Sequence, residues 1–251
     1  MIKFLFLLSP LAAKAQTSSH MLGLGPSKVL DTYLTPEKFS GTGYTYLYIR
    51  DNAPTDSLRK RWTTTIEHEL NLSTTKDRSG NASDLEVTYN LYGARYYNLY
   101  PASHLHLQVG AAINTCVGAI YNMTSSNNPA QARAAINIMP SGTATYNFNI
   151  RNQRFTARYE LNLPLLGVMF SPNYGQSYYE IFQLGNYDHN IVPVTFISAP
   201  SFRQVASIDW HYSPRWSLRL AYLGNYQQSQ VNNLKQHVYA HRFLIGLTRS
   251  L

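Results

Sequence analysis

The sequence is poor in cysteine and in charge. Cys116 is its only cysteine, so no disulfide can form within the chain. Asp, Glu, Lys and Arg make up 14% of the residues, against about a quarter in an average soluble domain. After Gln16 no run approaches the roughly 18 apolar residues of a membrane-spanning helix. These shortages exclude a disulfide scaffold and a helical membrane protein, and they argue against an ordinary water-exposed surface.

Aromatic residues are abundant instead. They reach 13% of the 251 residues and include 20 tyrosines. Disordered chains are poor in aromatics and rich in charge, so this chain is expected to fold. Its length suits one domain with a core of ordinary size.

The first 15 residues have the three parts of a secretory signal peptide. Lys3 supplies positive charge, residues 4–12 are mostly apolar, and Ala13-Lys14-Ala15 has the small-x-small pattern of a cleavage site. The apolar stretch is too short to span a bilayer. We therefore predict a signal peptide over residues 1–15, cleavage after Ala15, and a single mature domain over residues 16–251.

Much of the mature chain alternates between apolar and polar residues. In residues 155–165 the odd positions are all apolar, while the even ones include Thr156, Arg158, Glu160 and Asn162. This two-residue period indicates a β-strand with one apolar and one polar face. Similar alternation recurs around residues 61–72, 104–122, 136–150, 202–212 and 216–226.

Two folds accommodate such strands. In a soluble β-sandwich the apolar face forms the core, whereas in an outer-membrane β-barrel it meets lipid. The alternating runs are about 12–19 residues long, longer than the 5–6 residues typical of soluble strands. Trp210, Tyr212 and Trp216 bracket a tight turn, where an interfacial aromatic girdle would lie. Together with the signal peptide, these features predict an all-β transmembrane antiparallel up-and-down β-barrel.

Short and long links alternate along the chain, as periplasmic turns and extracellular loops do. The long links are expected at residues 75–83, 123–130, 171–192 and 227–235. Counting back from a last strand over residues 239–249 gives ten strands, with twelve as the alternative if residues 178–182 pair. A barrel of this size has a lumen that side chains largely fill.

Charged residues of both signs fall on the polar faces of these strands. Burying a charge is costly unless it is paired, so we expect ion pairs that plug the lumen. A proton or ion path through the same groups is the alternative. The candidates for lumen salt bridges are Glu67, Glu69, Glu86, Arg154, Arg158, Glu160, Arg203, Asp209, Arg219 and Arg242.

Two short patterns raise metal-binding or catalytic alternatives. His104 and His106 lie on one strand face, but no third metal ligand is visible nearby. Asp209 and His211 pair an acid with a base, yet both lie beside what the strand count makes a periplasmic turn. We therefore expect no metal and no cofactor, assign no catalytic residue, and regard an enzyme as the less favoured interpretation.

The long loop over residues 171–192 is unusually aromatic. We expect it to fold back onto the barrel mouth and to pack through its own side chains. It can also serve as a binding platform, because long loops on rigid scaffolds often carry binding. The loop binding candidates are Tyr174, Tyr178, Tyr179, Glu180 and Phe182.

Several stretches carry a family resemblance. They include Leu22-Gly23-Leu24-Gly25, residues 30–41, Tyr159-Glu160-Leu161-Asn162-Leu163-Pro164 with its continuation to residue 172, residues 174–182, and Val231-Asn232-Asn233. Together they resemble an uncharacterised family of Bacteroidales exported proteins, a domain of unknown function, through most of the mature chain. The resemblance implies a β-barrel in a Bacteroidota outer membrane. It implies no activity.

The sequence thus predicts an outer-membrane barrel that acts as a structural or a ligand- or partner-binding envelope protein. The alternatives are an outer-membrane hydrolase of lipid, lipopolysaccharide or peptide, and a narrow pore or a subunit of an envelope complex. Expected partners are outer-membrane lipid and other envelope proteins. The net charge of +8 does not indicate nucleic acid, because no nucleic-acid-binding motif is visible and export separates the chain from it.

Overall fold

The computed structural model describes residues 14–54, 61–125 and 128–250. The predicted signal peptide lies outside the described residues up to residue 13. The elements are β1 (Lys14–Asp31), β2 (Thr35–Pro54), β3 (Trp62–Lys76), β4 (Ser83–Ala102), β5 (Leu105–Asn122), β6 (Ala130–Ile150), β7 (Gln153–Asn162), β8 (Leu166–Phe170), α1 (Tyr178–Phe182), β9 (Ile191–Thr195), β10 (Phe202–His211), β11 (Trp216–Val231) and β12 (Leu234–Ser250). In this part of the chain, no helix has the length and apolar character needed to cross a bilayer.

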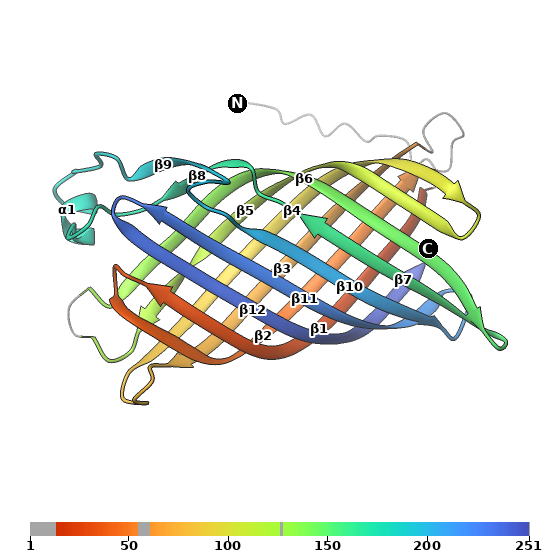
Figure 1. Ribbon diagram of the computed structural model, residues 1–251, viewed down its shortest axis with the longest axis horizontal. Helices are drawn as coiled ribbons and strands as arrows, with labels where there is room; N and C mark the ends of the chain where they lie inside the picture. Colours follow the sequence, from red (N-terminus) through yellow and green to blue (C-terminus); the bar gives the residue numbers. More distant parts are fainter. Residues whose placement is uncertain (1–13, 55–60, 126–127, 251) are drawn as a thin grey trace, which may run out of the picture.

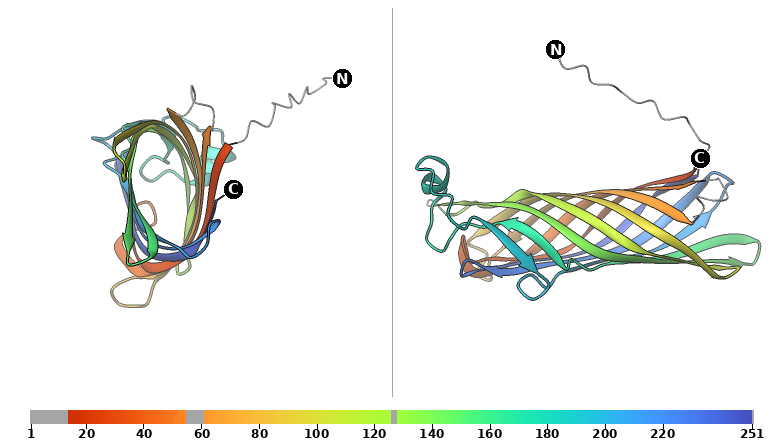
Figure 2. Two further views of the ribbon diagram at one scale, coloured as in Figure 1. Left: turned by 90° about the vertical axis from the view of Figure 1, so that its right-hand side faces the viewer. Right: turned by 90° about the horizontal axis from the view of Figure 1, so that it is seen from above.

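Ten of the twelve strands in the described residues close into a ring. The strands β1 to β7, β10, β11 and β12 each pair antiparallel with the next, and β12 pairs with β1 from Thr17↔Ser250 to Asp31↔Gln236. Seen along its axis the molecule is a closed oval of strands, and the strands tilt across the barrel in side view (Figures 1 and 2). The predicted ten-stranded barrel is confirmed.

The two extra strands, β8 and β9, form a hairpin that adds to β6 near its start. β8 pairs with β6 from Ala135↔Met169 to Ile138↔Leu166, and β9 pairs with β8. This hairpin lies at the same end of the barrel as α1 (Figure 1). The twelve-strand alternative placed the additional pairing at residues 178–182, which form α1 instead.

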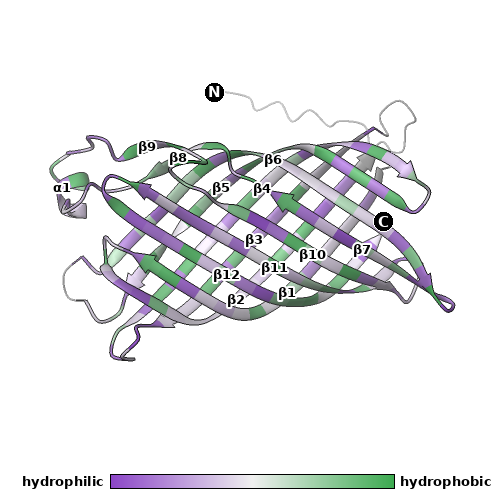
Figure 3. Cartoon of the chain, in the orientation of Figure 1, coloured by the Kyte–Doolittle hydropathy of each residue, from purple (hydrophilic) through white to green (hydrophobic). Residues whose placement is uncertain are grey.

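Burial alternates along the strands as the sequence predicts. In β3, Glu67 and Glu69 are buried, whereas Ile66 and Leu70, on either side of them, are exposed. Figure 3 shows the same alternation of hydrophilic and hydrophobic residues along the strands. Polar side chains inside and apolar ones outside reverse the arrangement of a soluble protein and match that of a transmembrane barrel.

The interior also contains apolar side chains. One buried cluster comprises Met21, Leu47, Ile49, Val205, Ala221, Leu223 and Leu244. These residues come from β1, β2, β10, β11 and β12. The lumen is therefore packed by side chains of both kinds rather than lined by a continuous polar surface.

All three tryptophans lie at the end of the barrel opposite α1. Trp62 begins β3, Trp210 lies near the end of β10, and Trp216 begins β11; each is about 40% exposed. The indole N–H of Trp210 donates a hydrogen bond of 3.0 Å to Gln153 Oε1. Partly exposed tryptophans with a polar partner at one level are typical of a membrane–water interface.

The link between β11 and β12 is shorter than predicted. A long loop over residues 227–235 was expected, but the two strands continue to Val231 and Leu234 and leave only Asn232 and Asn233 in the turn. Both asparagines have positive φ, 51° and 59°, the conformation of a type I′ hairpin turn. The loop prediction was wrong because residues 227–230 of β11 lie past the apolar band. There the strand is polar on both faces, so no alternation of apolar and polar residues marks it.

Candidate functional site

Arg203 is the centre of a buried ion cluster in the lumen. Its guanidinium contacts Glu67 Oε2 at 2.7 Å, Glu69 Oε2 at 2.8 Å and Glu160 Oε1 at 3.0 Å. The guanidinium carbon also lies 4.4 Å from the centroid of the Tyr92 ring. One arginine of β10 therefore holds three carboxylates from β3 and β7.

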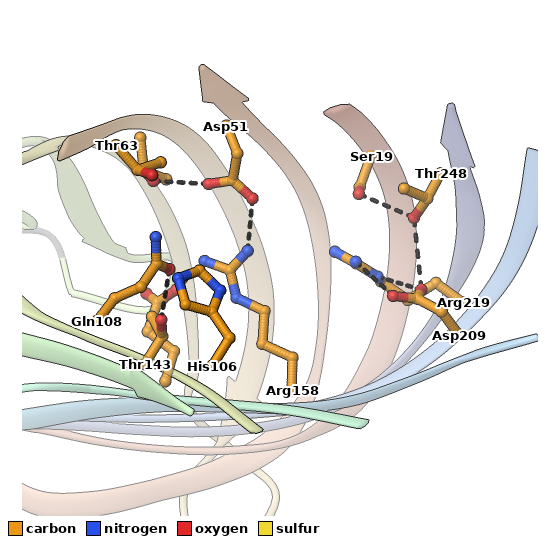
Figure 4. A network of polar contacts seen from close by, with 12 residues as sticks. Ser19, Asp51, Thr63, His106, Gln108, Thr143, Arg158, Asp209, Arg219 and Thr248 are labelled. Atoms are coloured by element: carbon orange, nitrogen blue, oxygen red, sulfur yellow. Dashed lines mark hydrogen bonds and ion pairs between the residues drawn. The ribbon is translucent and has the colours of Figure 1, made fainter. Parts of the chain in front are cut away.

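A second arginine crosses the lumen from β7. Arg158 contacts Glu160 Oε2 at 3.1 Å and Asp51 Oδ2 of β2 at 2.5 Å, and Asp51 also accepts a hydrogen bond from Thr65. Figure 4 shows Arg158 pointing across the barrel toward Asp51. In the ring of ten strands, β2 and β7 are five places apart, as are β3 and β10. Both arginines thus connect opposite walls.

Amide side chains complete the hydrogen bonding of the buried carboxylates. Asn71 and Asn225 each donate to Glu69 Oε1 at 2.9 Å. Asn162 donates to Glu160 Oε1 at 2.8 Å. Buried charges are tolerated when they are paired and their remaining lone pairs are satisfied, as here.

Two further ion pairs lie in the lumen, one toward each end of the barrel. Arg219 binds both oxygens of Asp209, with N···O distances of 2.6 and 2.7 Å (Figure 4). Arg133 Nη1 lies 3.7 Å from Glu86 Oε1, and Glu86 also accepts a hydrogen bond of 2.7 Å from Ser73. Each pair joins β-strands that are neighbours or next neighbours in the ring.

Arg242 is fully buried, but among the described residues it has no carboxylate partner. It donates instead to Ser27 Oγ at 2.7 Å, to Thr45 Oγ1 at 3.1 Å and to three backbone carbonyls. Gly43 leaves room for the guanidinium, because a Cβ there would overlap it. The expectation of an ion pair at Arg242 therefore gives way to a hydrogen-bonded guanidinium.

Arg154 lies apart from the lumen cluster. It is exposed beside the β6–β7 turn and has no ion pair within the described part of the chain. It lines an open cavity together with His104 and His211. Arg154 has the inward parity of Arg158, but it lies near the end of the barrel, where its side chain is exposed.

The acid and base that the sequence places together do not contact each other. Asp209 is engaged by Arg219, whereas His211 Nδ1 lies 2.7 Å from Ser217 Oγ and its Nε2 lies 2.8 Å from Thr156 Oγ1. Across residues 14–54, 61–125 and 128–250 there is also no cluster of three potential metal-ligating side chains. The polar groups of the lumen are arranged to pair with one another.

Two members of the lumen network escaped the sequence-based list. Asp51 was not among the candidates, yet β2 continues to Pro54 and carries Asp51 into the lumen. Arg133 could have been found, because it shares the parity of the inward-facing Asn137 on β6. Strand ends were the weak point of the prediction.

The extracellular loop over residues 171–190 is held in one conformation by the β11–β12 turn. The side-chain amide of Asn232 donates to the backbone carbonyls of His189 at 2.9 Å, Ser171 at 3.1 Å and Pro172 at 3.3 Å. These contacts fasten both ends of the loop to the same point. The loop packs onto the barrel mouth, as the sequence led us to expect.

Of the five loop candidates, Tyr178 and Glu180 are structural. The hydroxyl of Tyr178 donates to Gln131 Oε1 at 2.7 Å and accepts from the Ala132 N–H at 2.6 Å. Glu180 accepts from the N–H and hydroxyl of Ser177 in a capping box that begins α1. These hydrogen bonds hold the pKa of Glu180 below its usual value and keep it ionised.

The other three candidates face outward. Tyr174 is 73% exposed, Tyr179 64% and Phe182 59%, and Leu184 and Tyr187 beside them are exposed to a similar extent. Exposed aromatics on a firmly held loop lose little conformational freedom when they bind. We refer to Tyr174, Tyr179, Phe182, Leu184 and Tyr187 as the aromatic platform.

Asn232→Gly is expected to release the loop without breaking the turn. Glycine readily adopts the positive φ of this position but has no amide to donate to the three carbonyls. Chymotrypsin should therefore cut the loop of the folded protein several-fold faster in this variant. Asn233→Gly keeps the amide of Asn232 and is the matched control. Equal cleavage rates in the two variants would show that Asn232 does not hold the loop.

Solved barrel structures resemble this one in shape but scarcely in sequence. The outer membrane protease OmpT from Escherichia coli has a TM-score of 0.49 with 6% identity, covering 98% of this chain and 99% of that one. The transport unit of the autotransporter AIDA-I from Escherichia coli has a TM-score of 0.49 with 9% identity, covering 98% and 94%. For Ail of Yersinia pestis, in complex with the heparin analogue sucrose octasulfate, the values are 0.34, 8%, 94% and 99%. At 6–9% identity no activity transfers from these proteins.

A search of curated proteins gave no match. Residues 9–251 match the model of a family described as a protein of unknown function, DUF3316. The match covers almost the whole chain, and the protein belongs to this family.

Proposed function

We propose that the protein resides in the outer membrane as a barrel whose lumen is closed by its own side chains, and that it presents the aromatic platform to a ligand or partner outside the cell. The membrane location is supported by the apolar outer surface, the tryptophans at one end and the polar interior. Outer-membrane lipid is then the partner of the outer surface, and other envelope proteins are candidates for the platform.

β1 begins at Lys14, two residues before the proposed cleavage point. Among the described residues Lys14 and Ala15 pair only with β2, so cleavage would remove two residue pairs of the β1–β2 ladder. Cleavage after Ala15 would leave Gln16 at the mature N-terminus. The pairing of β1 with β12 begins at Thr17, so the closing contact of the barrel would be complete after cleavage.

The ion pairs across the lumen carry the proposal of a closed barrel. Arg203 joins β10 to β3, and Arg158 joins β7 to β2, so charged side chains meet near the barrel axis from opposite walls. An ion passing through would have to displace groups that are already paired and desolvated. This arrangement supports a binding role rather than a pore.

Purified protein in planar lipid bilayers is expected to produce no current steps. Its folded state is first checked by its faster migration on unboiled gels. The informative variant combines Asp51→Ala with Arg158→Ala, which removes one of the two cross-lumen contacts. Discrete openings of the natural protein that enlarge in this double variant would support a narrow pore and contradict the closed lumen.

The platform is the part of the molecule best suited to recognition. Its aromatic side chains lie on a loop that Asn232, Tyr178 and the α1 capping box hold in place. Aromatic anchors on rigid scaffolds are common in protein interfaces. By contrast, the engagement of Asp209 by Arg219 gives the hydrolase alternative no acid–base pair at this position.

A further inference from the structure

The barrel wall is interrupted at its extracellular half, between β9 and β11. β10 pairs with β11 only as far as Phe202↔Tyr226, while β11 continues to Val231. In the described part of the chain, β9 pairs with β8 and not with β11. Figure 1 shows the β8–β9 hairpin at the end of the barrel that carries α1, above β11 and β12 in this view.

The exposed edge of β11 obtains its hydrogen bonds from the connecting segment, residues 196–201. The Gln228 N–H donates to Ser201 Oγ at 3.1 Å, and the Gln230 N–H donates to the Ser198 carbonyl at 2.8 Å. A bare strand edge would offer its free N–H and C=O groups to other chains. These contacts stabilise the interruption without closing it as a β-ladder would.

A cavity of about 80 Å³ lies at the interruption and is lined by β9, the connecting segment and β11. Its lining includes Phe202 and Tyr226, whose rings stack 4.4 Å apart on the outer face, and Tyr92 and Cys116 from the lumen. Its other apolar lining residues include Met139, Met169, Phe170 and Val194. A mainly apolar space whose lining reaches the outward-facing rings of Phe202 and Tyr226 suits the first methylenes of a hydrocarbon chain.

Arg133 lines this cavity and has an unused donor. Its side chain is 8% exposed; Nη2 donates to Gln227 Oε1 at 2.7 Å, while Nη1 is 3.7 Å from Glu86, beyond hydrogen-bond distance. Nη1 has no hydrogen-bond partner among the described residues. A buried donor without an acceptor is unfavourable, and an anionic oxygen would satisfy it with a charge-assisted hydrogen bond.

We propose that this cavity binds a single-chain amphiphile with an anionic headgroup. The headgroup accepts a hydrogen bond from Arg133 Nη1, and the chain leaves past Phe202 and Tyr226, the last paired residues of β10 and β11, into the surrounding hydrocarbon. Phe196 and Ile197, in the connecting segment, are exposed and continue the apolar path outward. The site rests on the membrane location in the proposed function but is independent of the aromatic platform.

The site is tested with folded protein in phosphatidylcholine nanodiscs, titrated with the fluorescent long-chain carboxylate cis-parinaric acid. Saturable binding of one molecule per barrel is expected. Arg133→Gln should weaken it at least about tenfold, because it removes a charge-assisted hydrogen bond. Arg78→Gln changes an exposed arginine in the β3–β4 loop that does not line the cavity, so its affinity should equal that of the natural protein.

Competition on the natural protein needs no variant. A long-chain alcohol should displace the probe at least about tenfold less well than the carboxylate of the same length, because it lacks the anionic oxygen. Comparison with a lysophosphatidic acid of that chain length decides whether the natural headgroup is a carboxylate or a phosphate. Val194→Trp, which fills the apolar part of the cavity, should abolish saturable binding.

Equal affinity for the acid and the alcohol, unchanged affinity in Arg133→Gln, or no saturable binding would each overturn the site. The failure of folded protein to enter nanodiscs would overturn the membrane location itself. Insertion without saturable binding would overturn the amphiphile site alone.

Discussion

Arg203→Met is expected to destabilise the folded barrel by about 3–5 kcal/mol, the usual cost of removing one partner from a buried charge network. Methionine fills much of the space but leaves Glu67, Glu69 and Glu160 facing one another without the guanidinium that contacts all three. Unfolding by urea in lipid vesicles, followed by tryptophan fluorescence, measures the change in the free energy of unfolding. The folded band on unboiled gels should weaken in parallel.

Arg154→Met is the matched control, because Arg154 is exposed and lies outside the cluster. Its effect should stay within about 0.5 kcal/mol. Adding Glu67→Gln and Glu69→Gln to Arg203→Met should restore part of the lost stability, since two of the uncompensated charges disappear. If Arg203→Met unfolds at the same urea concentration as Arg154→Met, the ion cluster does not stabilise the barrel.

Leu220→Arg is expected to cost about 2–4 kcal/mol when the protein folds into lipid vesicles, the range for an arginine on the lipid face of a barrel near the bilayer centre. Leu220 is 56% exposed and lies four residues from Trp216 along β11. At an exposed position of a soluble protein the same change would be close to neutral. The variant therefore distinguishes lipid from water at the outer surface.

Asn81→Arg provides the comparison for this variant. Asn81 is exposed in the β3–β4 loop, outside the apolar band, and arginine there should leave the folded fraction unchanged. Should Leu220→Arg fold as completely as Asn81→Arg in vesicles, the outer surface would not face hydrocarbon. The proposed membrane location would then be wrong.

The sequence predicted the faces of the strands better than the partners across the lumen. Alternation follows from backbone geometry, because successive side chains of a strand point to opposite faces. It therefore placed Glu67, Glu69, Glu160 and Arg203 inside correctly. Which groups meet depends on the stagger between strands far apart in the chain; Arg203 and Glu67 are separated by 136 residues. Parity alone could not distinguish Arg158, which reaches Asp51, from Arg154, which does not.

The extracellular end was predicted less well for a related reason. Beyond the apolar band both faces of a strand meet water, so the alternation that marks a membrane strand disappears. This is why the upper part of β11 was assigned to a loop and the β8–β9 hairpin was not foreseen. The packing of the aromatic loop onto the mouth was predictable, because its side chains are too apolar for a free loop. Its anchor, Asn232, was not.

The seam between β1 and β12 has a consequence for biogenesis. These strands are the most distant in the chain, yet they pair from Thr17↔Ser250 to Asp31↔Gln236. The ring can therefore seal only after the last strand has been delivered, and until then the precursor is a sheet with two bare edges. Those edges must be kept from pairing with other chains during transit. Contacts that form only at sealing slow reopening rather than hasten assembly, so the ion cluster is expected to lengthen the lifetime of the finished barrel.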